Sequence, residues 1–170
     1  MLKLPIITTS IFSVMSQLAN QHGAINLSQG FPNFPVDNRL LDCVKQLIHE
    51  NVHQYTPMAG LPILLEKIAQ QTQKQYGRKV NPNTEILITA GATQGIYTAI
   101  NAWIQNGDEV IVLDPCYDSY EPSILMAGGK AVHVALNDDY TPNFNQIEAA
   151  ISSKTKMLII NNPHNPKGKN

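Results

Sequence analysis

The sequence predicts an α/β fold, with a mostly parallel sheet, flanking helices and an N-terminal helical arm. The main observation is that short apolar runs alternate with helical stretches in the second half of the chain. The expected strands are Ile86–Thr89, Val110–Leu113, Ala131–Ala135 and Met157–Ile160. These runs are continuously apolar, which is typical of parallel strands covered on both faces. The helices between them provide the crossovers that parallel pairing needs.

Residues 1–36 are expected to form an arm and a loop. The apolar residues 4–15 include a proline and several hydroxyl side chains, and no small-residue cleavage site follows, so we interpret them as an arm rather than a signal peptide. The arm should lead into a short amphipathic helix that ends near His22 and Gly23. Residues 24–36 contain a glycine and two prolines and should be irregular.

Residues 37–170 are expected to form one partial domain, which opens with two helices. Residues 37–51 carry apolar side chains at helical spacing, and Asp37 is suited to cap their N-terminus. A loop then leads to a second helix that ends near Gly77.

Local signals also define the helices between the strands. The first presents one apolar stripe, made of Ile96, Ala99, Ile100, Trp103 and Ile104. The second should run from about Ser119 to Met126 and end at a pair of glycines. The third should begin at Asn143, with Gln146 as its capping partner.

The composition excludes several classes of protein. A net charge of −1 offers no basic face for nucleic acid. No apolar stretch is long enough to span a bilayer, so we expect no membrane partner. The two cysteines form no CxxC pair, which favours reduced thiols in a cytoplasmic protein. Only 15% of the residues are charged, against about 25% in average domains, which indicates surface hidden by a partner or by further chain.

Ligands of such sheets bind outside the carboxyl ends of the strands. Polar or aromatic clusters follow three of the expected strands, at residues 89–95, 114–117 and 161–165. In the first, a small-residue turn opens a helix whose unpaired N–H groups suit an anion, and Thr93 adds a hydroxyl. An ordinary capped turn would look similar. The cluster matches neither GxGxxG nor GxxxxGK[ST], so it does not favour a dinucleotide or P-loop site.

The other two clusters each allow two interpretations. Tyr117 follows a strand-ending proline and is either a platform for a flat heterocycle or a half-buried core tyrosine. Asn165 lies between two prolines that fix its backbone, so its amide could donate to an oxygen held above the strand ends. The alternative for Asn165 is a proline-rich turn without a binding role.

Six motifs occur in an order that resembles a known family. They are Ser28-Gln29-Gly30-Phe31-Pro32, Gln54-Tyr55-Thr56-Pro57, Thr89-Ala90-Gly91-Ala92-Thr93, Gly107-Asp108-Glu109-Val110, Tyr117-Asp118-Ser119-Tyr120-Glu121-Pro122 and Asn162-Pro163-His164-Asn165-Pro166. The chain resembles the N-terminal part of class I/II aminotransferases, which are fold-type-I enzymes dependent on pyridoxal 5'-phosphate. It is most similar to the methionine and kynurenine aminotransferase branch, over essentially its whole length.

The resemblance implies how the cofactor would be bound. The N–H groups of Gly91, Ala92 and Thr93 would bind its phosphate. Tyr117 would stack on the pyridine ring, and Asn165 would hydrogen-bond the phenolic oxygen. The expected fold is therefore part of the large, cofactor-binding domain of this family.

The resemblance also implies substrates and a partner subunit. Gly30 would lie over the substrate carboxylate, and Tyr55 would reach into the neighbouring subunit's site of a homodimer. The reaction would move an amino group from a methionine-like or aromatic amino acid to a 2-oxo acid. The sequence leaves open the donor, the acceptor, and the choice between a transaminase and a carbon–sulfur lyase.

We assign no catalytic residue in this chain. In the family, a lysine holds the cofactor as a Schiff base, and that lysine and the substrate-binding arginine lie in downstream segments that have no counterpart here. Lys167 and Lys169, on the final turn, are not expected to substitute. The chain is therefore expected to be a shortened family member, inactive alone, from an interrupted gene or a shortened expression product. The alternatives are a non-catalytic remnant or a dimerising scaffold.

The segment His49–His53 matches HExxH, the zinc-peptidase signature. At about 100° per residue, both histidines would lie opposite the apolar stripe of their helix. Zinc ligands need a cleft and a third ligand, which this position does not offer. We therefore favour surface histidines over a zinc peptidase and expect no metal site.

Overall fold

The computed structural model describes residues 9–30 and 32–169. Residues 1–8, which belong to the predicted arm, lie outside the described residues. The described chain divides into two compact units between Ile88 and Thr89, and each is described by itself. The predicted boundary at residue 36 stays a prediction.

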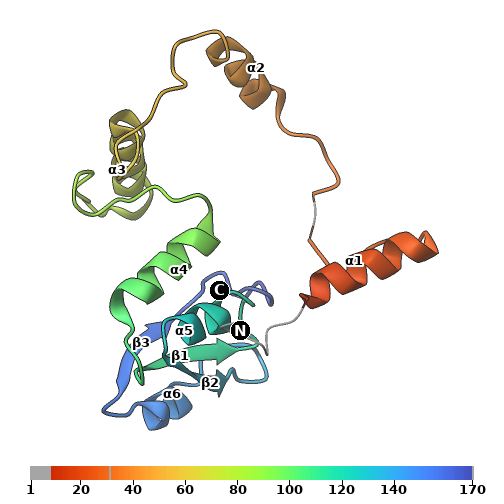
Figure 1. Cartoon of the computed structure of the whole chain (residues 1–170), viewed down its shortest axis with the longest axis vertical. Coiled ribbons are helices and arrows are strands. Elements are labelled where there is room, and N and C mark those ends of the chain that lie inside the picture. Colours follow the sequence, from red (N-terminus) through yellow and green to blue (C-terminus); the bar gives the residue numbers. More distant parts are fainter. Residues whose placement is uncertain (1–8, 31, 170) are drawn as a thin grey trace. The chain divides into compact units, whose positions relative to one another are not determined.

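The unit of residues 9–88 is helical. It contains α1 (Ile11–His22), α2 (Asn38–Leu47) and α3 (Pro62–Tyr76) (Figure 1). Side-chain caps begin two of these helices: Ser10 Oγ accepts from the Phe12 N–H at 3.2 Å, and Asp37 Oδ1 accepts from the Arg39 N–H at 2.8 Å. The predicted cap at Asp37 is therefore confirmed.

Glycines end α1 and α3 where the sequence predicts. Gly23 and Gly77 follow the two helices with φ of 60° and 68°. This left-handed conformation is the usual helix stop and favours glycine.

The helix predicted over residues 37–51 is wrong in its last turn, because α2 ends at Leu47. The N–H of Glu50 donates to the Leu47 carbonyl at 3.0 Å, a tighter turn than an α-helix makes. The His53 Nε2 atom lies 3.1 Å from the Ile48 carbonyl oxygen. Local hydrogen bonds thus satisfy the helix end and replace the helical pattern.

The predicted strand Ile86–Thr89 is not formed among the described residues, which corrects the expected four strands to three. The Ile88 N–H donates to the Ala59 carbonyl at 2.9 Å, in the loop before α3. Leu87 is 59% exposed although it belongs to an apolar run. An apolar run identifies a segment that prefers burial, but only a neighbouring strand makes it part of a sheet.

Residues 89–169 form the second unit, built on a parallel sheet. Its elements are α4 (Ala92–Trp103), β1 (Glu109–Asp114), α5 (Tyr120–Met126), β2 (Lys130–Ala135), α6 (Phe144–Ala150) and β3 (Thr155–Ile159). The strand order is β2-β1-β3 and both pairings are parallel, so β1 is central (Figure 1). This confirms the predicted α/β fold with a parallel sheet and flanking helices.

Helices cover both faces of this sheet. The core shared with α4 and α5 consists of Ile100, Ile104, Val110, Val112, Tyr120 and Ile124. The core shared with α6 consists of Ile111, Leu113, Val134 and Ile147. Alternate side chains of β1 enter opposite cores, which explains why its sequence is continuously apolar.

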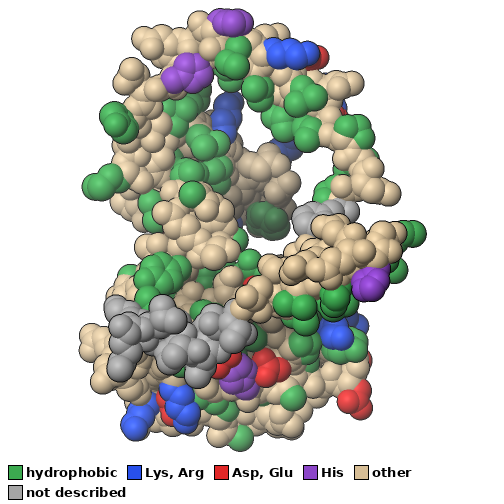
Figure 2. All heavy atoms as spheres, turned by 45° about the vertical axis from the view of Figure 1, so that its right-hand side comes forward, with side chains coloured by type: hydrophobic (Ala, Val, Ile, Leu, Met, Phe, Trp, Pro, Cys, Tyr) green, Lys and Arg blue, Asp and Glu red, His purple; other side chains and the backbone are tan. Residues whose placement is uncertain are grey.

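Several large apolar side chains remain at the surface. Trp103, predicted to share the buried stripe of α4, is 76% exposed. It is the last residue of the helix, and Ile104 turns into an extended conformation and is buried instead. Figure 2 shows further hydrophobic side chains on the visible face. Within the described ranges, no helix has the length and apolar character needed to cross a membrane.

Candidate functional site

The carboxyl ends of β1 and β3 lie at the same edge of the sheet. β1 ends at Asp114 and β3 at Ile159, and Val112 pairs with Ile159 in parallel register. Tyr117 follows β1 and Asn165 follows β3, so both belong to segments that leave the sheet at this edge. This is the position that ligands of parallel sheets prefer.

The first turn of α4 has the geometry of an anion site. Gly91 precedes the helix with φ 83° and ψ 167°, a conformation that only glycine readily adopts, and its side-chain position is open. Ala92 and Thr93 begin the helix, so their N–H groups have no acceptor within it. The Gly91 N–H, in contrast, donates to the Thr89 carbonyl at 2.9 Å. The N–H groups available to an anion are therefore those of Ala92 and Thr93.

Thr93 and Tyr117 are brought together by the fold. Thr93 Oγ1 lies 3.2 Å from the Tyr117 hydroxyl. The Tyr117 ring meets Tyr120 edge-on, with ring centroids 5.7 Å apart. The side-chain hydrogen bond with Ser119, and then the one with Thr93, lowers the pKa of Tyr117. The tyrosine next to the start of α4 is thus fixed at both its ring and its hydroxyl.

A second contact ties α5 to the segment that follows β3. Tyr120 is 7% exposed, and the nearby side chain of Asn161 partly offsets the rise in its pKa. Burial is the largest cause that raises the pKa of Tyr120, so its hydroxyl remains protonated at neutral pH. Tyr120 belongs to the motif Tyr117–Pro122, for which the family resemblance implied a role only at Tyr117. Its place as the first residue of α5, three residues after Tyr117, is the signal that could have found it.

Asn165 lies in an exposed turn after β3. The Gly168 N–H donates to the His164 carbonyl at 2.5 Å, and the His164 N–H donates to the Lys169 carbonyl at 2.7 Å. His164 is buried and its Nδ1 has no hydrogen-bond partner in the described chain. Asn165 follows β3 in this turn, and within the described residues it makes no hydrogen bond to Thr93 or Tyr117.

Gly30 and Tyr55 belong to the helical unit. The segment before Gly30 is held to α1, because Asn26 Nδ2 donates to Ser16 Oγ at 2.9 Å and Ser16 Oγ donates to Gln29 Oε1 at 3.0 Å. The Tyr55 side chain is fully exposed. The roles of these two residues stay predictions.

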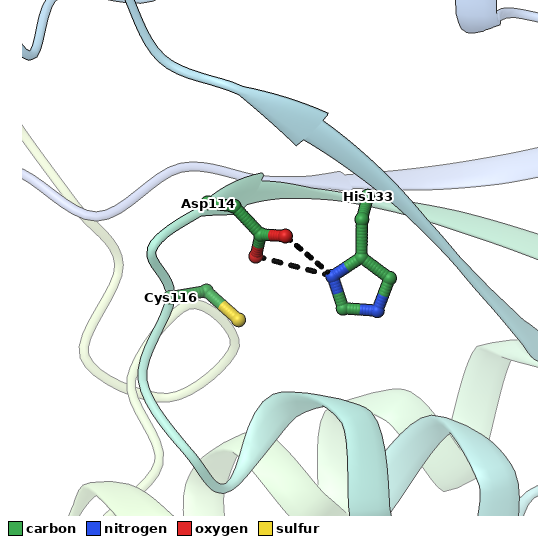
Figure 3. Close-up of side chains that lie close together, drawn as sticks. All are labelled: Asp114, Cys116 and His133. Carbon is green, nitrogen blue, oxygen red and sulfur yellow. Dashed lines mark hydrogen bonds and ion pairs between the residues drawn. The ribbon is translucent and has the colours of Figure 1, made fainter.

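Three side chains meet at the end of β1 (Figure 3), two from the cluster at residues 114–117 and the third, His133, from a strand that the sequence did not connect with it. Asp114 Oδ2 lies 2.9 Å from Nδ1 of His133 on β2, and one atom each of Asp114, Cys116 and His133 lies within 4.8 Å of the others. Burial, and then the hydrogen bond to Asp114, raises the pKa of the Cys116 thiol to about 12. This group depends on the register of β1 against β2, which apolar runs do not encode.

The HExxH segment has no metal-site geometry. It follows the end of α2, so His49 and His53 share no helical face. In the described ranges, the one group of three potential metal ligands contains neither histidine. The zinc-peptidase hypothesis therefore has no support.

Comparisons with known proteins point to one family. Residues 22–170 match the family described as aminotransferase class I and II. The methionine aminotransferase of Escherichia coli K12 is 44% identical over 165 residues, which are 96% of this chain and 43% of that protein. Kynurenine–oxoglutarate transaminase 3 of Rattus norvegicus is 35% identical over 172 residues, which cover 94% of this chain and 38% of that protein. The chain spans less than half the length of these curated relatives.

Solved structures agree with this result. A crystal structure of an E. coli protein identified as a methionine aminotransferase has a TM-score of 0.92 at 44% identity, covering 98% of this chain and 44% of that chain. An aspartate aminotransferase of Thermus thermophilus, a single mutant, has a TM-score of 0.86 at 27% identity, covering 96% of this chain and 44% of that chain.

Proposed function

This chain belongs to the class I and II aminotransferase family, and we propose that its sheet edge binds pyridoxal 5'-phosphate for transfer of an amino group from an amino acid to a 2-oxo acid. The start of α4 carries this proposal, because it offers helix N–H groups without acceptors and its Thr93 hydroxyl lies 3.2 Å from that of Tyr117, which follows β1. The names of the relatives favour a methionine-like or aromatic donor.

The residues of this edge fit a phosphorylated aromatic ring. The N–H groups of Ala92 and Thr93 and the positive end of the helix dipole suit the phosphate dianion. Gly91 leaves the approach to them open, since a Cβ built there would meet nothing within 4 Å. The first proposed phosphate donor, the Gly91 N–H, is bonded to Thr89 and would have to exchange partners.

Two side chains would orient the ring. Tyr117 offers an aromatic face next to the phosphate position, and its bond to Thr93 couples that face to the helix start. Asn165 would donate its amide to the phenolic oxygen of the ring. When bound, pyridoxal phosphate supplies an electron sink that acidifies the α proton of an amino acid.

The substrate side and the partner are proposed from the family. Gly30 would lie over the substrate carboxylate, and Tyr55 of one copy would reach the site of the other in a cytoplasmic homodimer. The exposure of Tyr55 supports a role outside its own unit, and the two free cysteines support a reducing compartment.

Binding of a phosphorylated pyridine to the purified chain tests the cofactor site. Pyridoxamine phosphate is the suitable ligand, because it has no aldehyde to react with surface lysines. We expect Thr93→Val to weaken its binding about tenfold or more, from the loss of one charge-assisted hydrogen bond. Thr98→Val, on the exposed part of the same helix, is the matched control and should bind like the original chain.

Calorimetry with pyridoxamine phosphate and with pyridoxamine separates the phosphate contribution from ring stacking. Equal affinities for the two ligands, or equal losses in both valine variants, would remove the phosphate site at α4.

We also propose that the cofactor-holding lysine is not among the lysines of this chain, so the chain alone does not transaminate. Formation of the corresponding 2-oxo acid from methionine or kynurenine, by the purified chain with added cofactor and a 2-oxo acid acceptor, would contradict this proposal.

A further inference from the structure

Two strands of the sheet present polar side chains to the same face. Val112 pairs with His133, and Asp114 pairs with Ala135, so Asp114 lies two residues beyond the position that pairs with His133. Side chains at alternate positions point to the same side of a sheet. Val112 lies in the core shared with α4 and α5, which places Asp114 and His133 on the α5 side.

Cys116 and Glu121 complete the surroundings of this pair. Figure 3 shows the thiol of Cys116 directed toward the space between the Asp114 carboxylate and the His133 ring. Glu121, in the first turn of α5, lies with Oε1 3.8 Å from the other ring nitrogen of His133, Nε2. The imidazole is therefore flanked by a carboxylate at each nitrogen, with the thiol beside one of them.

The geometry points to a binding site for one zinc ion, held by the carboxylate of Asp114, the thiolate of Cys116 and Nδ1 of His133, with Glu121 orienting the imidazole through Nε2. Sulfur, imidazole nitrogen and carboxylate oxygen are the three ligand types that zinc uses in proteins. A fourth position would be left for water or another small ligand. The sequence alone predicted no metal site.

The distances suit a metal ion of this size. Zinc–ligand bonds of about 2.0 to 2.3 Å place tetrahedral ligand atoms about 3.3 to 3.6 Å apart. The Asp114 oxygens already lie 2.9 and 3.1 Å from Nδ1 of His133, and all three ligand atoms lie within 4.8 Å of one another. Binding thus requires side-chain shifts of about 1 Å, and the ion would displace the thiol proton to solvent.

Glu121 supplies the outer contact that metal-bound histidines usually have. A ligating imidazole commonly donates its second N–H to a carboxylate, which fixes the ring and strengthens the bond to the metal. His133 Nε2 lies 3.8 Å from Glu121 Oε1, so the two groups would have to approach by about 1 Å to make this bond.

A nucleophilic cysteine is the main alternative for a Cys–His–Asp group, and the geometry disfavours it. In such an arrangement one imidazole nitrogen faces the thiol and the other faces the carboxylate. Here both nitrogens of His133 face carboxylates, at 2.9 Å for Asp114 and 3.8 Å for Glu121. Nδ1 is held by Asp114, and among the described residues no hydrogen bond joins the Cys116 thiol to either imidazole nitrogen.

Titration of the reduced, chelator-treated chain with cobalt(II), followed by displacement with zinc, tests the proposal. We expect one ion per chain and a thiolate-to-cobalt charge-transfer absorption that zinc abolishes. Cys116→Ser should remove that absorption. Glu121→Gln, which removes the outer contact, should weaken zinc binding about 10- to 100-fold. His133→Gln removes a ligand and should weaken zinc binding at least as much.

Matched controls separate this site from other potential ligands. Cys43→Ser removes the other cysteine, and His49→Gln removes a histidine of the HExxH segment, so both should change zinc affinity by no more than about twofold. Circular dichroism checks that each variant is folded. Should Cys116→Ser fail to fold, the cobalt spectrum of the original chain and the loss in His133→Gln decide the question.

Absence of ion uptake at micromolar zinc would overturn the proposal. So would a cobalt spectrum without thiolate absorption, or an affinity that depends on Cys43 or His49 rather than on Cys116 and His133.

Discussion

Gly91 sets the conformation of the turn that opens α4. Its φ of 83° and ψ of 167° lie in a region that is strained for any residue with a Cβ. We expect Gly91→Ala to lower the free energy of unfolding by about 1–3 kcal/mol. The Cβ itself would meet no atom within 4 Å, so this loss measures backbone strain alone.

Gly30→Ala is the matched control for this change. Gly30 has no positive φ and open space around it, so the substitution should be close to neutral. Urea unfolding of both variants checks the prediction, which fails if the two alanines have equal effects.

Single residues were predicted well where the signal is local. The caps at Asp37 and Asn143 and the helix stops at Gly23 and Gly77 depend on neighbours within four residues, and the structure confirms them. The approach of Thr93 to Tyr117 is different, because it joins residues 24 positions apart. The family resemblance indicated one common site for these two residues, but no local pattern contains the contact between them.

The helix α4 has one buried and one exposed side, and this difference can be measured. Ile100 is 1% exposed, whereas Trp103 is 76% exposed. Ile100→Ala should lower the free energy of unfolding by about 2–5 kcal/mol, since it leaves a cavity in the core. Trp103→Ala should change it by no more than about 0.5 kcal/mol, as for other surface positions. Chemical denaturation of the two variants tests this, and a large loss at Trp103 would contradict the exposed placement.

The start of β1 is tied to the turn before β3 by an ionisable group. Ser152 Oγ donates to Glu109 Oε2 at 2.6 Å, and this hydrogen bond is the largest cause that lowers the pKa of Glu109 below 4.5. A carboxyl with a lowered folded pKa stabilises the protein above its unfolded pKa, and this stabilisation is lost as the pH falls through the folded pKa.

Ser152→Ala should therefore lower stability at neutral pH and weaken its dependence on pH below 4.5. Ser153→Ala, at the next and exposed position, is the control and should leave the pH profile unchanged. Urea midpoints measured from pH 7 down to pH 3 check this expectation. Parallel profiles for the original chain and Ser152→Ala would show that the bond does not affect the ionisation of Glu109.

Elements were predicted where apolar periodicity and caps agree, as in α1, α3, α5, α6 and the three strands. The run Ile86–Thr89 was mispredicted because its hydrophobicity does not supply a pairing strand. The end of α2 was mispredicted because the apolar stripe continues to Ile48 while the backbone turns. Both errors come from interactions that a periodic pattern cannot contain.

The two units differ in how much they bury. In the described chain, α1 and α2 contain no buried residue, whereas four residues of β1 are buried. Local opening is easiest where few side chains leave water. We expect amide hydrogens of α1 and α2 to exchange first and those of β1 to exchange last. Native-state hydrogen exchange read by mass spectrometry tests this order, and equal protection of the two units would refute it.

The order β2-β1-β3 gives the described sheet two outer strands, so along one side of β3 the backbone amides and carbonyls face no described neighbour. An edge strand of this kind can pair with a further strand, because an incoming segment can hydrogen-bond to it while the existing sheet keeps its register. The sheet can therefore gain a strand next to β3. A strand from another segment or from a second copy of the chain could hydrogen-bond along this side of β3.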